Sequence, residues 1–274
     1  MADDHEDVIA AIRGAMGALS QFVDALVPRM RDGGRLIYLG AGTSGRLGVL
    51  DASECPPTFQ SDPNQVIGII AGGDAALRRS SEGKEDEPTG AAEALAALRL
   101  TNRDTVLGIA AGGTTPFALG AMSIAKCSEV MTGLLTCAPL KEPPRDCDHV
   151  IVLDTGPELL TGSTRLKAGS ATKLALNIIS TAAFTQLGKV YSNLMVDLKA
   201  SNAKLTDRAI RILLELCPEL SRPAAAERLE QAGRELKTAI VMQRLDVTAD
   251  EARAMLNNSQ GRLSHALGED SNTK

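Results

Sequence analysis

The sequence has few aromatic residues, no basic surplus and no long apolar run. Only 2% of the 274 residues are aromatic, tryptophan is absent, and the net charge at pH 7 is −5. Nucleic-acid-binding proteins need a basic surface and often use stacking rings, so this composition argues against a nucleic-acid partner. Because no run of roughly 18 apolar residues occurs, we expect no contact with a membrane.

Cysteine and histidine are also scarce, and neither is arranged as a metal site. The five cysteines form no Cys-x-x-Cys pair, and the three histidines are scattered along the chain. An odd number of isolated cysteines argues against a disulfide framework, and the spacing of zinc ligands is missing. The acidic residues 1–10 also lack the basic-then-apolar order of a signal peptide. We therefore expect reduced thiols, no metal and a cytoplasmic protein.

Five short apolar runs dominate the first part of the chain. They lie at residues 35–42, 65–72, 104–111, 129–137 and 149–156. Continuous rather than alternating apolar runs are typical of strands buried on both faces, as in a parallel sheet. Helix-like segments at 44–53, 87–99 and 115–127 separate most of the runs. This alternation predicts an α/β fold, a three-layer α-β-α sandwich around a five-stranded parallel sheet.

Further helical segments flank the predicted sheet. Apolar residues recur at helical spacing in 6–31, and residues 165–188 and 196–216 also have helical patterns. The composition changes at Pro218, after which four short helical stretches follow, at 221–233, 235–243, 248–257 and 260–267. We therefore expect a sheet domain with its leading and trailing helices over residues 1–216, and a small all-helical domain over 217–274.

A glycine-rich loop follows the first predicted strand. Open parallel sheets bind ligands beyond the carboxyl ends of their strands. Glycines let the backbone approach an anion closely, and a helix start offers unpaired N–H groups. The candidate phosphate-binding residues of this loop are Gly42, Thr43, Ser44, Gly45 and Arg46. The alternative is a tight turn in which a hydroxyl simply caps the helix.

The same loop is not typical of a nucleotide site. Gly40, Gly42 and Gly45 formally make a G-x-G-x-x-G motif, but the acidic residue expected about 20 residues later is missing. A Gly-Lys-Ser/Thr sequence, which a Walker loop requires, does not follow either. The pattern therefore argues against both dinucleotide and nucleoside triphosphate binding.

Two further segments supply candidate anion-binding groups. A second Gly/Thr loop after the third predicted strand contains Gly113, Thr114 and Thr115, and its alternative reading is a plain turn before a helix. At the start of the helix predicted from residue 165, the candidates are Ser163, Thr164, Arg165 and Lys167. Cations at a helix start oppose the helix dipole, which hints at an anionic ligand. The alternative is a surface pair neutralised by Glu158.

Five segments together resemble one enzyme family. They are residues 39–58, 82–86, 161–169, 193–197 and 237–242. The chain is similar over about residues 15–268 to the N-acetylmuramic acid 6-phosphate etherases, members of the sugar isomerase (SIS) domain superfamily with flavodoxin-like winding, which are related to glucokinase regulatory protein.

The resemblance implies an activity, an assembly and two catalytic residues. The family consists of cytoplasmic lyases of cell-wall amino-sugar recycling that cleave the D-lactyl ether of N-acetylmuramic acid 6-phosphate. Its members use no cofactor and form homodimers with sites near the subunit interface. The catalytic acids of the family correspond to Glu54, which would protonate the leaving oxygen, and Glu85, which would remove the C2 proton. The resemblance supports these two residues as the catalytic pair more strongly than it supports which of them is the acid and which is the base.

The sequence departs from the family pattern in two places. The family's second loop typically reads Ala-Ser-Gly-Arg-Thr-Pro, whereas Gly112 and Thr114 stand here in place of the serine and the arginine. The N-terminal segment that typically precedes the first long helix is also shortened. These departures keep two alternatives to the etherase open: a sugar-phosphate-binding regulator without turnover, and an aldose–ketose sugar-phosphate isomerase.

Overall fold

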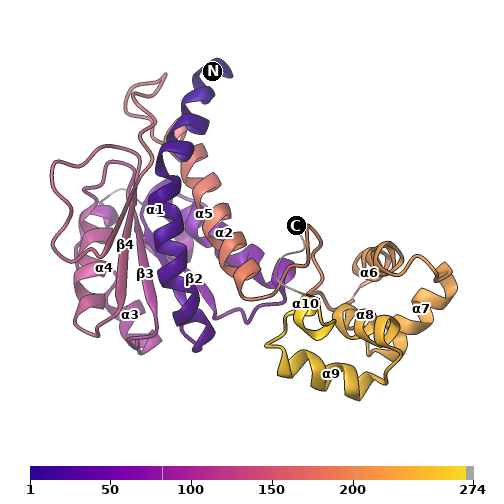
Figure 1. The fold of residues 1–274 in the computed structure, drawn as a ribbon. Coiled ribbons are helices and arrows are strands. Elements are labelled where there is room, and N and C mark those ends of the chain that lie inside the picture. The colour runs from indigo at the N-terminus through magenta and orange to yellow at the C-terminus, as the bar shows by residue number, and fades with distance from the viewer. Residues whose placement is uncertain (82, 201, 270–274) are drawn as a thin grey trace. The chain divides into compact units, whose positions relative to one another are not determined.

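Five parallel strands form the sheet of the first part of the molecule. The computed structural model describes residues 1–81, 83–200 and 202–269, so Glu82 of the family-like segment 82–86 lies outside the described residues (Figure 1). The strands are β1 (Leu36–Gly40), β2 (Val66–Ile70), β3 (Thr105–Ile109), β4 (Met131–Thr136) and β5 (His149–Val152). Each lies inside one of the five apolar runs, which confirms the predicted strands.

The strand order creates one crevice at the middle of the sheet. All neighbours pair in parallel in the order β2-β1-β3-β4-β5, so β1 and β3 lie side by side. The chain leaves β1 toward β2 on one side, and the connection that leaves β3 runs toward β4 on the other. At such a switch point the loops that follow two adjacent strands diverge, which opens room for a ligand at the carboxyl edge of the sheet.

Helices cover both faces of the sheet, as the three-layer prediction requires (Figure 1). One face carries α1 (Glu6–Arg31), α2 (Gly42–Phe59) and α5 (Lys167–Gln186), and the other carries α3 (Ala92–Leu98) and α4 (Pro116–Lys126). On the first face, the ring of Phe22 meets His149 of β5 edge-on, with centroids 5.8 Å apart. On the second, Leu95 and Phe117 share an apolar core with Leu39 of β1. The α/β fold class is therefore confirmed.

Helix α1 is long and apolar enough to cross a membrane, and one side of it is buried in the fold. By length and apolar content alone, the segment from Asp3 to Arg31 could cross a membrane. In the fold its apolar side is turned inward, since Val8, Leu19 and Phe22 are at most 5% exposed. A long apolar stripe on one side of a helix is what packing against a sheet requires.

Helix α2 runs antiparallel to β1, from the carboxyl edge of the sheet toward its amino edge. Glycines allow this close approach: a Cβ atom at Gly45 would lie 2.4 Å from the carbonyl oxygen of Gly40 at the end of β1. One turn later, a Cβ at Gly48 would lie 2.9 Å from the Cβ of Tyr38, in the middle of the strand. Every residue beyond Gly48 therefore lies farther from the glycine-rich loop.

Helix α2 also continues past its expected end. The sequence predicts a stop near residue 53, before two consecutive prolines, but the helix includes Pro56 and Pro57 and ends at Phe59. Proline removes a backbone donor, yet its fixed φ is compatible with a helix, so α2 continues through both prolines at the cost of backbone hydrogen bonds. In the preceding turn, side chains add local bonds: the Ser53 hydroxyl donates to the carbonyl of Leu50 at 2.8 Å.

The chain divides into two compact units, each built from two segments. The first comprises Met1–Cys55 and Asp62–Ala183, and the second Pro56–Ser61 and Phe184–Lys274. The helices of the second unit are α6 (Ala203–Leu216), α7 (Arg222–Gln231), α8 (Leu236–Leu245), α9 (Ala249–Asn258) and α10 (Leu263–Ala266). We expected the helical part to begin at residue 217, whereas α6 also shares its buried core with α7 and α8.

An aromatic contact joins the two segments of the second unit, and a buried lysine ties together parts of the longer segment. The rings of Phe59, from the end of α2, and Phe184, from α5, stack with centroids 4.6 Å apart. Lys237 of α8 donates hydrogen bonds to Asp197 at 2.9 Å and to the carbonyls of Gly188 and Gly261 at 2.8 and 2.7 Å. All three donors of this buried ammonium are therefore used within the unit.

Candidate functional site

The first loop at the carboxyl edge is shaped by its glycines. Gly42 has a φ of +54°, in the left-handed region that favours glycine. At Gly45 a side chain would collide with the carbonyl oxygen of Gly40, as the packing of α2 has shown. Thr43 and Ser44 follow directly in the first turn of α2. The tight-turn interpretation therefore accounts for the two glycines, and anion binding by the loop stays a prediction.

Arg46 is engaged inside the protein. Its guanidinium donates to the backbone carbonyls of Ala76, Leu77 and Arg79 at 2.7, 3.2 and 3.3 Å. These carbonyls belong to the 3₁₀ turn η2 (Asp74–Leu77) and the residues after it. Arg46 thus ties the segment that follows β2 to the start of α2, which leaves it fewer donors for a ligand.

The second loop is tight at one glycine and open at the other. Gly113 is buried with a φ of +73°, and a Cβ there would lie 2.4 Å from Cδ2 of Leu140. A Cβ at Gly112 would meet only the hydroxyl oxygen of Thr114, at 3.9 Å. Gly112 and Thr114 are exposed, and Thr115 is half-buried just before α4. A serine at position 112, as in the family pattern, would therefore fit this backbone.

The start of α5 is already neutralised by a carboxylate. Glu158 accepts hydrogen bonds from the backbone N–H groups of Lys167 and Ala168, at 2.9 and 3.0 Å. The ammonium of Lys167 is 2.8 Å from Asp7 and 3.0 Å from Asp4, and its side chain is 2% exposed. The candidate Lys167 is thus directed toward the N-terminal segment. Before it, Ser163 is half-buried and Thr164 is exposed.

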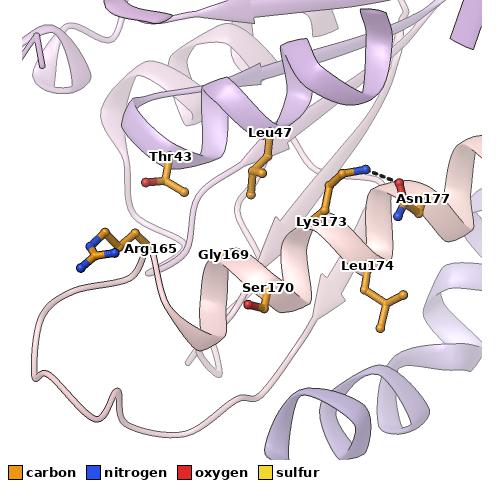
Figure 2. Close-up of a pocket in the computed structure, with 8 residues that line it drawn as sticks. All are labelled: Thr43, Leu47, Arg165, Gly169, Ser170, Lys173, Leu174 and Asn177. Atoms are coloured by element: carbon orange, nitrogen blue, oxygen red, sulfur yellow. Dashed lines mark hydrogen bonds between the residues drawn. The ribbon is translucent and has the colours of Figure 1, made fainter. Parts of the chain in front are cut away.

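A cavity of about 460 Å³ lies between α2 and α5 in the first unit (Figure 2). Eight residues line it: Thr43, Leu47, Arg165, Gly169, Ser170, Lys173, Leu174 and Asn177. Thr43 and Arg165 come from the predicted set and lie at the same end. Figure 2 shows Lys173 and Asn177 at the other end, joined by a hydrogen bond from Nζ of Lys173 to Oδ1 of Asn177.

A buried polar network lies behind Lys173. Asp51 of α2 is 4% exposed and accepts hydrogen bonds from the hydroxyls of Tyr38 and Ser180, at 3.0 and 3.3 Å. Its Oδ1 atom is 4.0 Å from Nζ of Lys173. Burial raises the pKa of Asp51, while the Tyr38 hydrogen bond and the charge of Lys173 act in the opposite direction. A carboxylate this deep is tolerated only with such partners.

Sequence reasoning missed Lys173, Asn177 and Asp51. The available signal was the pair of polar residues four positions apart, Lys173 and Asn177, in the apolar segment 165–188, a spacing that places both on one side of a helix. Asp51 lies in the family-like segment 39–58 but was not singled out, because a single acidic residue in a helix is usually solvated.

The two predicted catalytic acids are both exposed and belong to different elements. Glu54 lies ten residues after Ser44 on α2, about 15 Å of helix rise beyond the first loop. Glu85 is in the 3₁₀ turn η3 (Lys84–Asp86), after β2. The hydroxyl of Ser81 donates to the carbonyl of Ala71 at 3.2 Å, which keeps the segment leading to Glu85 at the carboxyl edge. Both residues stay predictions.

Helix α2 lies between the cavity and the residues that directly follow β2; farther along that segment, η3, which carries Glu85, packs against α4. Thr43 and Leu47 line the cavity facing α5, whereas Arg46 binds the carbonyls of the segment after β2. Among the residues the structure describes, no group of three or more His, Cys, Asp or Glu side chains could hold a metal ion. The polar groups that line the cavity are the hydroxyls of Thr43 and Ser170, the amide of Asn177 and the cations of Arg165 and Lys173. This set suits an anionic polar ligand.

Known proteins are similar to this chain at three levels. The model of the glucokinase regulatory protein N-terminal SIS domain matches residues 18–126. An N-acetylmuramic acid 6-phosphate etherase of Synechococcus sp. (strain CC9605) is 52% identical over 267 residues, which cover 97% of this chain and 84% of the relative. One of Gloeobacter violaceus (strain ATCC 29082 / PCC 7421) is 54% identical over 239 residues, 87% of this chain and 78% of the relative.

A solved structure shares the fold. A protein assigned as a phosphosugar isomerase involved in capsule formation, from Bacteroides fragilis NCTC 9343, superposes with a TM-score of 0.50 at 15% identity. The match covers 66% of this chain and 86% of that one, and at this identity it supports the fold alone. The two relatives, in contrast, match 97% and 87% of this chain, and more than half of the matched residues are identical. The chain belongs to the N-acetylmuramic acid 6-phosphate etherase family.

Proposed function

We propose that the protein is a carbon–oxygen lyase that cleaves the D-lactyl ether of N-acetylmuramic acid 6-phosphate. The products are N-acetylglucosamine 6-phosphate and D-lactate. The observation that carries the proposal is the similarity to etherases over nearly the whole chain, including the segments that contain Glu54 and Glu85. The reaction belongs to cell-wall amino-sugar recycling, and we place it in the cytoplasm.

The reaction needs two carboxyl groups in opposite initial protonation states. The open-chain sugar has an aldehyde at C1, which acidifies the proton at C2. Glu85 as the base removes this proton, the C3–O bond breaks, and Glu54 as the acid protonates the lactate oxygen. Water activated by Glu54 then adds to C3 of the conjugated intermediate, and the proton returns to C2. Because the aldehyde provides the acidification, these steps need no metal and no organic cofactor.

The position of α2 supports a site shared between two chains. The cavity and Glu54 lie along one side of α2, whereas η3, which carries Glu85, packs against α4 on the other face of the sheet. A second copy of the chain, bringing its own Glu85 to the open cavity, completes the acid–base pair. Leu50, one turn before Glu54, is 42% exposed and offers this copy an apolar contact. We therefore propose a homodimer.

The experiment that tests the function measures D-lactate release from N-acetylmuramic acid 6-phosphate. Glu54→Gln and Glu85→Gln should each lower kcat by about a hundredfold or more, because each removes a proton-transfer group. Each variant alone should still bind the sugar phosphate. Wild-type protein that binds this substrate but releases no D-lactate would contradict the lyase proposal.

Mixing the two inactive variants tests the shared site. A mixed dimer has one site that lacks both carboxylates and one that keeps both, provided that each site takes its two residues from different chains. After exchange of subunits, about a quarter of the wild-type activity should return, since half of the dimers are mixed and each has one intact site. No recovery, with exchange verified by mass spectrometry, would place both residues in the same chain.

A second candidate function rests on the second loop. Gly112 and Thr114 provide neither the serine nor the arginine of the family pattern, and a protein that binds sugar phosphates without turnover would tolerate this loss. The D-lactate assay separates the two functions directly. An aldose–ketose isomerase would instead convert glucosamine-type 6-phosphates without releasing any acid.

A further inference from the structure

The substrate of the proposed reaction carries two anions, and the sequence assigns candidate binding groups only to the phosphate. We propose that Lys173 binds the lactyl carboxylate, at the end of the cavity opposite Thr43 and Arg165, and that Asp51 positions its ammonium for this contact. The inference rests on the proposed function and deepens it, because it names the residue that distinguishes the substrate from the lactate-free product.

Lys173 keeps donors for a ligand, unlike the other lysine near the start of α5. Its ammonium has three protons and donates to Asn177, while the 4.0 Å separation from Asp51 is too long for a hydrogen bond. Its side chain is 34% exposed toward the cavity. Lys167, six residues earlier, is 2% exposed and paired with Asp4 and Asp7 at no more than 3.0 Å.

The two ends of the cavity are spaced like the two anions of the substrate. At one end of the cavity, a Cβ atom on Gly169 would lie 3.5 Å from Cγ2 of Thr43. Lys173 lies one turn farther along α5 than Gly169, which is about 6 Å of helix rise. The extended lysine side chain adds to this separation. In an open-chain sugar with bonds of about 1.5 Å, the phosphate and the lactyl carboxylate lie on the order of 10 Å apart. A cavity of about 460 Å³ is large enough for a small molecule of this kind.

The ammonium of Lys173 also lies close to the turn that carries Glu54. Its nitrogen is 4.0 Å from Oδ1 of Asp51, which lies three residues before Glu54 on α2. Lys173 therefore lies at the end of the cavity that is nearer to Glu54 along α2. A lactyl carboxylate on Lys173 would place its ether oxygen at the end where the predicted acid is found.

The buried network explains why Lys173 stays at this end. Asp51 is held by the hydroxyls of Tyr38, in β1, and Ser180, in α5, so its position is set by the sheet and by a neighbouring helix. Its charge attracts the ammonium without forming the close pair that would consume the donors of Lys173. A carboxylate at this distance is suited to orient a cation and leave it available.

The test compares two ligands that differ by the lactyl group. With Glu54→Gln as the background, in which the substrate binds without being cleaved, Lys173→Met should raise the Kd of N-acetylmuramic acid 6-phosphate, measured by calorimetry, at least about tenfold, since a charge-assisted bond is lost. The Kd of N-acetylglucosamine 6-phosphate should change less than about twofold, and Lys173→Arg should restore part of the loss. The matched control is Lys204→Met, an exposed lysine of α6, which should change neither Kd.

The outcomes separate this inference from the proposed function. Equal weakening of both ligands, or no change in either, overturns the role of Lys173 whether or not D-lactate is formed. A wild-type protein without turnover contradicts the lyase proposal alone, because the ratio of the two Kd values still reports on the carboxylate contact. In an active enzyme, Lys173→Met should raise KM for the substrate more than it lowers kcat.

Asp51→Asn tests the positioning role separately. The amide keeps an acceptor for Tyr38 but removes the charge beside Lys173. The ratio considered is the Kd of N-acetylglucosamine 6-phosphate divided by the Kd of N-acetylmuramic acid 6-phosphate. Asp51→Asn should lower this ratio by a smaller factor than Lys173→Met does. The double variant should have the same ratio as Lys173→Met alone. A variant that loses thermal stability but keeps the wild-type ratio would show that Asp51 is only structural.

Discussion

The polar groups at the two edges of the sheet differ in whether they are paired within the protein. At the amino edge, Asp104 before β3 accepts hydrogen bonds from the backbone N–H, Nε and Nη2 of Arg35 at 2.9, 2.9 and 2.8 Å. It also accepts from the backbone N–H of Thr101 at 2.8 Å. At the carboxyl edge, Gly112, Thr114 and Arg165 are exposed, and Arg165 forms no ion pair with any residue that the structure describes.

The difference separates groups that stabilise the fold from groups that are free to bind. A buried carboxylate with five donors, the hydroxyl of Thr101 at 3.3 Å included, contributes to stability because each partner replaces a lost contact with water. Exposed loops with spare donors contribute little to stability, but they can hold a ligand without first breaking an internal bond. The following predictions test this division, from the largest expected effect to the smallest.

The largest effect should come from the amino edge. Asp104→Asn removes the charge that pairs with Arg35 and one of the two oxygens that accept from its guanidinium, which keeps its bond to the carbonyl of Leu98 at 2.9 Å. We expect the free energy of unfolding to fall by about 3 kcal/mol, as for other disrupted buried pairs. Denaturant titration measures this change, with Asp24→Asn on the exposed side of α1 as the control. The affinity for sugar phosphate should not change, and a loss of affinity would contradict the division.

The same pair predicts an acid-dependent loss of stability. Burial alone would raise the pKa of Asp104, but hydrogen bonds from Arg35 and Thr101, together with the charge of Arg35, lower it below its ordinary value. A lowered folded-state pKa stabilises the protein above the unfolded pKa of about 3.9 and loses this contribution as the pH falls further. Asp104→Asn should lack this part of the acid dependence. The free energy of unfolding is measured against pH for both proteins, and two curves that stay parallel below pH 4 would contradict the prediction.

The fold could be predicted largely from sequence because its signals are local. Each apolar run contains a strand, and the loops after β1 and β3 lie at the expected edge. Contacts between distant residues were beyond reach: Lys167 is paired by Asp7, 160 residues away, and Asp51 is bound by Ser180, 129 residues away. Nothing in the sequence near one partner indicates the other. The predicted ligand group Lys167 therefore proved to be paired within the protein, and the cavity residue Lys173 was missed.

The end of α2 could not be predicted for a different reason. Prolines ordinarily mark a helix boundary, because the missing donor weakens the helix where nothing compensates. In this protein the last turn of α2 carries Phe59, which is 6% exposed and stacked on Phe184. Burial of this ring outweighs the local signal, and that contact exists only after the chain has folded.

A smaller effect should distinguish the two glycines of the second loop. Gly113→Ala places a Cβ against Leu140 in a left-handed backbone, and should lower the free energy of unfolding by about 1–2 kcal/mol. Gly112→Ala should change it by less than about 0.5 kcal/mol, because the position is open. Thermal denaturation of both variants measures the difference, and equal effects would show that the loop is not rigid at Gly113.

The smallest effect is a gain at the carboxyl edge. Gly112→Ser introduces the hydroxyl of the family pattern into open space, where its closest neighbour is the Thr114 hydroxyl, 3.9 Å from the new Cβ. We expect sugar phosphates to bind up to about tenfold more tightly, the value of one hydrogen bond to a charged group, without a change in stability. Gly112→Ala is the control for added bulk, and an equal gain in both variants would rule out a hydroxyl contact.

The split composition of the second unit has a consequence for synthesis and dissection of the protein. Pro56–Ser61 leave the ribosome long before Phe184, yet the unit needs both segments for its stacked rings. The unit can therefore complete its folding only after Phe184 and the helices that follow it have been synthesised. A fragment that starts at Phe184 lacks Phe59, the ring on which Phe184 stacks. Anyone who wants the helical part alone must graft residues 56–61 back onto it.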